Sequence, residues 1–269
     1  MMNTLRNIAL IATTEMQRTL VTRRGLISLT AFALVWLLLL LIVIQRAPAI
    51  ITSGTAIGSM FQSESIMSLS QWQIPEFGAY WFIALYLFPF FSVFFSADQT
   101  ATDRARGTLK LLSLHTTRTS LFFGRFLGVM LVQGIIIALA LLSTVVVAMI
   151  REPSVLAESL QNTLFIWTNL IIVIAPYTAL MAIISLLAKT SMQAINYAAI
   201  LWILFFFAVY WISNKFPQAA MLKSFFPGSQ INDLARFHDW QSLSTALVPA
   251  VQTMVLLAGG WLLIERIDL

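Results

Sequence analysis

Six long apolar runs alternate with polar segments along the chain, and this alternation predicts an all-α integral membrane protein. The runs cover residues 26–44, 77–97, 126–150, 164–188, 194–212 and 245–264. A helix that crosses the hydrocarbon core of a bilayer needs about 20 consecutive apolar residues, and each run reaches or approaches that length. We therefore predict six transmembrane helices that form a single membrane domain over residues 1–269.

The segment before the first apolar run has helical periodicity. Leu5, Ile8, Ala12, Met16 and Leu20 recur every three or four residues. This spacing predicts an N-terminal amphipathic helix that lies along the inner membrane surface. The alternative is a solvated leader whose basic residues only set the orientation of the first span.

Residues 213–244, between the fifth and sixth runs, predict a short helical hairpin. Leu222, Phe225 and Phe226 share one helical face, Pro227-Gly228 breaks the chain, and Ile231, Leu234 and Ala235 begin a second amphipathic stretch. Such a hairpin either dips back between the spans, where protein shields its non-helical backbone, or lies on the outer surface.

The composition excludes an ordinary soluble domain. Hydrophobic residues make up 59% of the chain, charged residues 10%, and the mean hydropathy is +0.86, whereas soluble domains contain about 25% charged residues. The six spans leave no room for a separate soluble catalytic domain, so any energy source must come from another protein. The absence of cysteine excludes disulfides and thiol nucleophiles.

The basic residues predict the orientation. With the N-terminus in the cytoplasm, eleven of the sixteen Lys and Arg residues fall on the cytoplasmic side, as the positive-inside rule requires. Both termini are then cytoplasmic. This sorting also accounts for the net charge of +5, and nucleic acid is not expected as a partner.

Few residues in the spans could carry chemistry. The phosphate-loop pattern G-x-x-x-x-G-K-[ST] does not occur, and His115 and His238 fall in loops on opposite sides of the membrane. We therefore expect no catalytic, cofactor-binding or metal site in this chain. Gln133, Asn169 and Asn196 could line a polar substrate path, but a single amide in a span more often bonds a neighbouring helix, and we favour that role.

The stretch from Asp98 to Ser120 concentrates charge between the second and third runs. Gly107 can end a helix in the left-handed conformation, and Thr108 can cap a new short helix. This helix would present Leu109 and Leu112 on one face, with Arg104, Arg106, Lys110 and Arg118 around it. An apolar centre with a basic rim suits docking into a groove on a soluble partner, and the alternative is a solvated connector.

The string DRARGTLKLLSLHTTRTSLFFGRFLG resembles the signature of type-2 ABC-transporter permeases. The matching positions are Arg104, Arg106, Gly107, Thr108, Leu109, Leu111, Leu112, Arg118, Arg125, Phe126, Leu127 and Gly128. The layout of a surface helix, six spans and a hairpin before the sixth span is similar too. One position departs from the family, which commonly has Glu before Arg-Gly-Thr-Leu where this chain has Ala105.

The resemblance implies the permease subunit of a bacterial ABC exporter in the cytoplasmic (inner) membrane. Such a permease pairs with a second permease copy, in a homodimer or heterodimer surrounded by lipid. It is not itself an enzyme, because a separate ATPase subunit binds ATP and Mg and grips the crosswise helix. The ATPase-coupling residues would be Arg104, Arg106, Gly107, Thr108, Leu109, Lys110, Leu112 and Arg118.

Two other functions remain open at this point. The chain could be a membrane anchor that transmits ATPase motion to an outer-side partner without transport, or an ATP-independent carrier. The sequence of the spans does not select a substrate, although the lack of charge mildly favours an apolar or amphipathic cargo.

Overall fold

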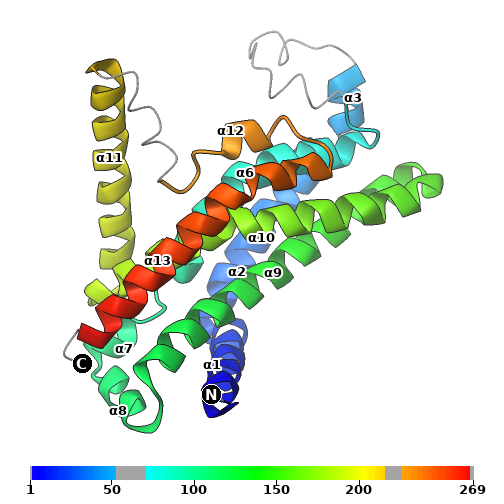
Figure 1. The fold of residues 1–269 in the computed structure, drawn as a ribbon. Coiled ribbons are helices and arrows are strands. Elements are labelled where there is room, and N and C mark those ends of the chain that lie inside the picture. The colour runs from blue at the N-terminus through cyan, green and yellow to red at the C-terminus, as the bar shows by residue number, and fades with distance from the viewer. Residues whose placement is uncertain (1, 53–70, 216–225, 267–269) are drawn as a thin grey trace.

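The computed structural model describes residues 2–52, 71–215 and 226–266, and within these ranges the chain is almost entirely helical without any strand. The elements in order are α1 (Met2–Val21), α2 (Arg23–Leu39), the π-helical turn η1 (Leu40–Ile44), α3 (Ala47–Thr52), α6 (Pro75–Ser96), α7 (Ala101–Ala105), α8 (Thr108–His115), α9 (Arg118–Arg151), the 3₁₀ turn η3 (Pro153–Val155), α10 (Leu156–Leu187), α11 (Ser191–Lys215), α12 (Ile231–Leu234), the 3₁₀ segment η5 (Trp240–Thr245) and α13 (Leu247–Arg266). The two termini lie at the same end of the molecule, here called the inner end (Figure 1).

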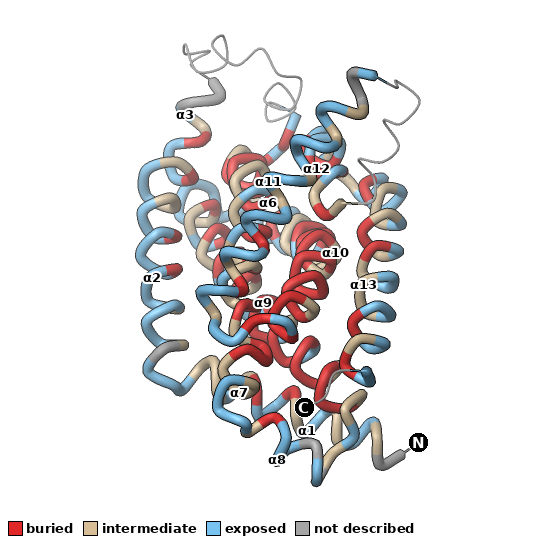
Figure 2. Tube along the Cα trace, turned by 90° about the vertical axis from the view of Figure 1, so that its left-hand side faces the viewer, coloured by how far each residue is buried: buried red, intermediate tan, exposed pale blue. Residues whose placement is uncertain are grey.

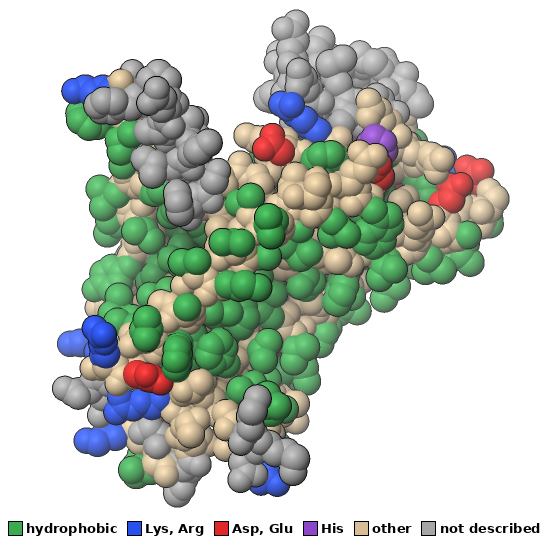
Figure 3. Space-filling model, in the orientation of Figure 1, with side chains coloured by type: hydrophobic (Ala, Val, Ile, Leu, Met, Phe, Trp, Pro, Cys, Tyr) green, Lys and Arg blue, Asp and Glu red, His purple; other side chains and the backbone are tan. Residues whose placement is uncertain are grey.

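Each of the six predicted spans corresponds to helix that is long and apolar enough to cross a membrane. These segments are Gly25–Ala49, Pro75–Ala105, Arg118–Arg151, Pro153–Leu187, Ser191–Ile212 and Trp240–Arg266. The third begins eight residues earlier than its apolar run because Thr117 caps the helix by accepting a hydrogen bond from the Ser120 amide at 3.1 Å. Figure 3 shows apolar side chains across the middle of one face and charged side chains at its two ends.

The core lies where α6, α9 and α10 pack together, and α10 runs through its centre (Figure 2). Tyr80, Trp81 and Phe165 are among its largest fully buried side chains. At the outer end, Arg151 at the end of α9 grips Glu76 at the start of α6, with Nε–Oε1 and Nη2–Oε2 distances of 2.7 and 3.2 Å. This ion pair fixes the outer ends of two core helices against each other.

The described part of the outer hairpin enters the bundle, as one of the two predicted alternatives requires. Gly228 has a φ of +96°, and a Cβ on it would lie 2.1 Å from the hydroxyl of Tyr177, past the midpoint of α10. The following α12 buries Ile231 and Leu234 in the core, and the carbonyl of Leu234 accepts the Trp81 indole N–H at 3.2 Å. Within this turn Pro227 and Gln230 are buried while Ser229 is exposed, so the bundle covers the non-helical backbone on one side; the predicted face residues Leu222 and Phe225 lie outside the described residues.

Candidate functional site

The short helix α8 lies at the inner end of the bundle (Figure 1), and Gly107 directly precedes its first residue. Gly107 has a φ of 72° and forms the N-cap of α8, a left-handed conformation that other residues rarely adopt. Thr108, predicted to be the cap, is instead the first helical residue. Its hydroxyl turns back and donates toward the carbonyl and the carboxylate of Asp103, each at 3.1 Å, and so ties α8 to α7.

The leucines of α8 divide between two sides. Leu109 is only 2% exposed, whereas Leu112 is 39% exposed. The prediction that Leu109 and Leu112 together form the outward face of α8 is therefore wrong for Leu109. Leu109 lies in the first turn of α8 and packs against the bundle. The outward apolar surface consists of Leu111, Leu112 and Leu114, here called the leucine knob; Leu111 and Leu114 are 61% and 74% exposed.

The predicted basic rim also divides. Arg104 donates to the Leu186 carbonyl at the inner end of α10, and Arg118 donates to the carbonyls of Ile264 and Glu265 at the end of α13, at 3.3 and 3.1 Å. Both guanidinium groups therefore satisfy carbonyls at helix C-termini, where the backbone lacks partners. Arg106 and Lys110 are exposed beside the leucine knob.

A cluster of charges behind α8 joins three elements that the sequence did not bring together. The Asp103 carboxylate of α7 accepts from Arg18 of α1 at 3.0 Å and from Arg125 of α9. Arg125 is 3% exposed and also donates to the Gln99 carbonyl, while Arg18 donates to the Asp98 carbonyl at 2.9 Å. We call Arg18, Asp103 and Arg125 the charge triad.

The N-terminal helix α1 packs directly on α9 beside the triad. A Cβ on Gly124 would lie 2.7 Å from the Ile11 Cβ, and a Cβ on Gly128 would lie 2.7 Å from the Glu15 Cβ. Small residues four apart let two helix backbones approach closely. The G-x-x-x-G spacing within GRFLG was the available signal for this contact, which makes α1 part of the bundle; its position on the inner membrane surface stays a prediction.

Glu15 of α1 is buried at this contact and lies 3.0 Å from Arg18. Burial raises the pKa of the Glu15 carboxyl above its ordinary value, because a charged group is poorly solvated there, and the positive charges of Arg18 and Arg125 oppose that shift. The inner end therefore contains two acids and two bases in contact, and a displacement of α7 would disturb all of them.

The three amides considered for a substrate path do not come together. Gln133 is buried and donates to Ser92 and Ser96 of α6, each at 3.2 Å, while its carbonyl accepts from Thr178 of α10. Asn169 donates to the Phe165 carbonyl and accepts from Ser242 at 2.9 Å, whereas Asn196 is exposed on α11. Gln133 and Asn169 therefore hold the bundle together, which is the role favoured from the sequence.

These features define a multi-pass membrane protein with a crosswise helix held at one end of its bundle. A family model described as "ABC-2 family transporter protein" matches residues 9–258. The match covers most of the chain, so the protein belongs to this family and is a permease component of an ABC transporter. A comparison with curated proteins finds no match.

Proposed function

We propose that this chain couples ATP hydrolysis by a separate ATPase subunit to the export of a substrate across the bacterial cytoplasmic membrane. The observation that carries the proposal is the leucine knob, an exposed apolar surface on a helix that the charge triad links to both α1 and α9. Exposed apolar patches mark sites of contact with a protein or a membrane, and we take the end that holds both termini as the cytoplasmic end, as the positive-inside rule predicts.

The proposed transmission follows from the contacts of α8. An ATPase subunit that carries ATP and Mg grips the leucine knob, with Arg106 and Lys110 at its rim. When ATP closes the ATPase pair, α8 and α7 move together because Thr108 is bonded to Asp103. Asp103 then pulls on α1 through Arg18 and on α9 through Arg125. Transport is driven only if the ATPase binds the two permease conformations with different affinity.

An apolar groove supports a path for an apolar or amphipathic cargo. It lies between α6, α10 and α11, has a volume of about 420 Å³, and includes Phe90, Phe94, Tyr177 and Trp202 in its lining. Much of α11 beyond it is exposed and aromatic, with Phe206 and Phe207 more than 60% exposed. A second permease copy facing this side would enclose the groove, as expected for a permease dimer.

The test replaces Leu112 by aspartate. Placing a charge in the centre of an apolar contact costs several kcal/mol of binding, so L112D should lose the ATPase subunit on purification from gently solubilised membranes. Leu112→Met keeps the volume and apolarity and should retain the subunit. Both variants should keep the thermal stability of the parent, because Leu112 is partly exposed.

Unchanged recovery of the ATPase with L112D would refute this docking surface. Reconstitution of the purified complex in liposomes then separates the remaining functions. ATP-dependent solute movement is expected of an exporter, whereas an anchor would hydrolyse ATP without moving a solute, and a carrier would transport with the ATPase absent.

A further inference from the structure

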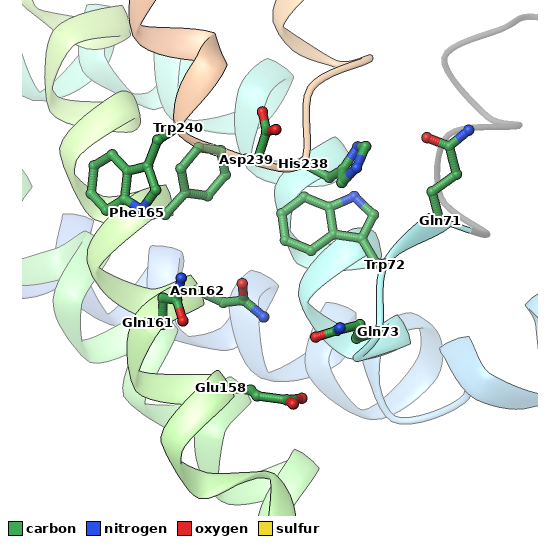
Figure 4. A pocket seen from close by; sticks show the side chains of 10 residues that line it. All are labelled: Gln71, Trp72, Gln73, Glu158, Gln161, Asn162, Phe165, His238, Asp239 and Trp240. Carbon is green, nitrogen blue, oxygen red and sulfur yellow. The ribbon is translucent and has the colours of Figure 1, made fainter.

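A second site lies at the outer end of the bundle, opposite the leucine knob. A cavity of about 320 Å³ opens between the segment before α6, the first turns of α10 and the start of η5. Its lining consists of Gln71, Trp72, Gln73, Glu158, Gln161, Asn162, Phe165, His238, Asp239 and Trp240. Figure 4 shows these side chains arriving from the three segments around one hollow. The volume is at the lower end of the range for small-molecule sites.

One side of this outer pocket is an aromatic wall. The rings of Trp72 and Phe165 lie with centroids 6.1 Å apart, and those of Phe165 and Trp240 lie 5.6 Å apart with their planes nearly perpendicular. Because each ring packs on the next, they form a row and do not surround a central point. Trp240 is 38% exposed while Phe165 is 2% exposed, so Trp240 offers its ring to a ligand and Phe165 supports it.

The rest of the lining can make many hydrogen bonds without supplying a positive charge. Gln71, Gln73, Gln161 and Asn162 each combine two N–H donors with a carbonyl acceptor, and among the described residues no Lys or Arg belongs to the lining. An anionic ligand would therefore find no Lys or Arg counter-charge among the described lining residues, whose one imidazole, His238, directly precedes the Asp239 carboxylate in the chain.

The two carboxylates of the pocket already have structural roles. Asp239 caps η5 by accepting from the Gln241 amide at 3.1 Å, and Glu158 lies in the first turn of α10, where the helix dipole favours a negative charge. A cation is therefore not required to balance them.

We propose that the outer pocket binds the uncharged, hydroxyl-rich ring of a small saccharide. The C–H groups on one face of a sugar ring carry slight positive charge and suit the electron-rich face of Trp240. The hydroxyl groups, which both donate and accept, suit the amides around the wall. A quaternary ammonium ion, the main competitor, needs rings on several sides and leaves four amides without a role. The proposal does not depend on the transport function.

The experiment measures saccharide binding to the full-length protein in nanodiscs of phosphatidylethanolamine and phosphatidylglycerol. Maltoside detergents and choline lipids are avoided, because they carry the two competing ligand chemistries. Saturation-transfer NMR is recorded with maltose, lactose, cellobiose and chitobiose, and with choline as the competing probe. At least one disaccharide should receive magnetisation from the protein, and addition of choline should not displace it.

Three variants locate the site. Trp240→Ala removes the stacking surface and should weaken disaccharide binding by about tenfold or more, whereas Trp211→Ala, on the exposed side of α11, is the matched control and should change nothing. Asn162→Asp keeps the side-chain volume but replaces donors with an anion. It should weaken saccharide binding, whereas a cation site would bind choline more tightly.

The proposal is overturned if none of the four disaccharides binds to the folded protein, or if binding survives both W240A and N162D. It is also overturned if choline binds and gains affinity in N162D. Melting curves of each variant show that a loss of binding does not reflect unfolding, and N162D covers the case in which W240A alone fails to fold.

Discussion

Helices α10 and α11 follow each other directly in the chain, are both strongly apolar, and occupy opposite environments. In the most apolar stretch of α10 72% of the residues are buried, while in that of α11 only 6% are. The mean hydropathies of these two stretches, 2.5 and 2.0, are close. Figure 1 shows α11 standing apart from the helices that surround α10.

The difference in burial between α10 and α11 follows from the small polar residues that occur between the large apolar ones. On α10, Thr178 bonds Ser92 at 2.9 Å and Ser185 bonds Thr100 at 2.8 Å, both with fully buried hydroxyls. Small hydroxyl residues allow helices to approach and to bond across the interface. Helix α11 touches the bundle chiefly through Ala194, Ala198 and Trp202, and the rest of its surface suits lipid or another protein. Hydropathy therefore predicts that a helix crosses the membrane, but not what covers it.

Among substitutions in the closely packed helices, the largest loss of stability is expected at the charge triad. Asp103→Ala leaves the buried Arg125 guanidinium without its carboxylate, and breaking a buried ion pair from one side costs about 3–5 kcal/mol. We expect D103A to lower the free energy of unfolding by about that amount in denaturant titrations of the protein in nanodiscs. Glu265→Ala, at an exposed position of α13, should cost less than about 0.5 kcal/mol. A loss below about 1 kcal/mol in D103A would show that water reaches Arg125.

A pair of truncations tests the comparison of α10 with α11 directly. Ile174→Ala on α10, at a side chain 1% exposed, should cost about 3 kcal/mol because it leaves a cavity in the core. Leu204→Ala on α11, at a side chain 62% exposed, should cost less than about 0.5 kcal/mol in the isolated chain. Both values come from the same unfolding titration. Equal losses of unfolding free energy in I174A and L204A would mean that Leu204 is buried in the isolated chain. The difference in burial between α10 and α11 would then not hold.

The sequence predicted the elements of this fold well because the bilayer sets their length. The six apolar helices, the N-terminal helix and the break at Gly107 all follow from local signals, namely apolar length, helical periodicity and the conformational freedom of glycine. The boundaries were less accurate: the third span gained residues 118–125 because Thr117 caps a helix that continues beyond the apolar run. A cap is visible in the sequence, but polar residues of a long helix outside the hydrocarbon are not distinguished from a loop.

The geometry around α8 was predicted only in part, because its contacts are not local, and the role of these residues in ATPase coupling stays a prediction. Asp103 and Arg18 are 85 residues apart in the chain, and no local pattern pairs them. The inward position of Leu109 depends on how α8 lies against the bundle, which the spacing of Leu109 and Leu112 does not reveal. Arg104 and Arg118 fitted a basic rim equally well before their carbonyl partners were known.

A smaller effect is expected from the close contact of α1 with α9. Gly128→Val would place its Cβ 2.7 Å from the Glu15 Cβ and 2.8 Å from the Ala12 carbonyl oxygen, and overpacking of this kind costs about 1–3 kcal/mol. Gly259→Val is the matched control, because a Cβ there meets nothing within 4 Å. We expect G128V, but not G259V, to unfold at lower temperature and to release α1 to limited proteolysis. Equal melting temperatures of G128V and G259V would indicate that α1 can shift on α9 without a loss of stability.

The smallest effect concerns pH. Because burial raises the pKa of Glu15, the folded protein holds a proton on this carboxyl over a pH range in which the unfolded chain has lost it. The stabilisation is fully present below the ordinary pKa of 4.5 and is lost as the pH rises through the raised value. Glu15→Gln keeps the shape and remains uncharged, so its unfolding free energy should fall less than that of the parent between pH 4 and pH 7. If the two pH profiles are parallel, the Arg18 and Arg125 charges fully compensate the burial of Glu15, and a carboxylate at the contact of α1 with α9 does not reduce the free energy of unfolding.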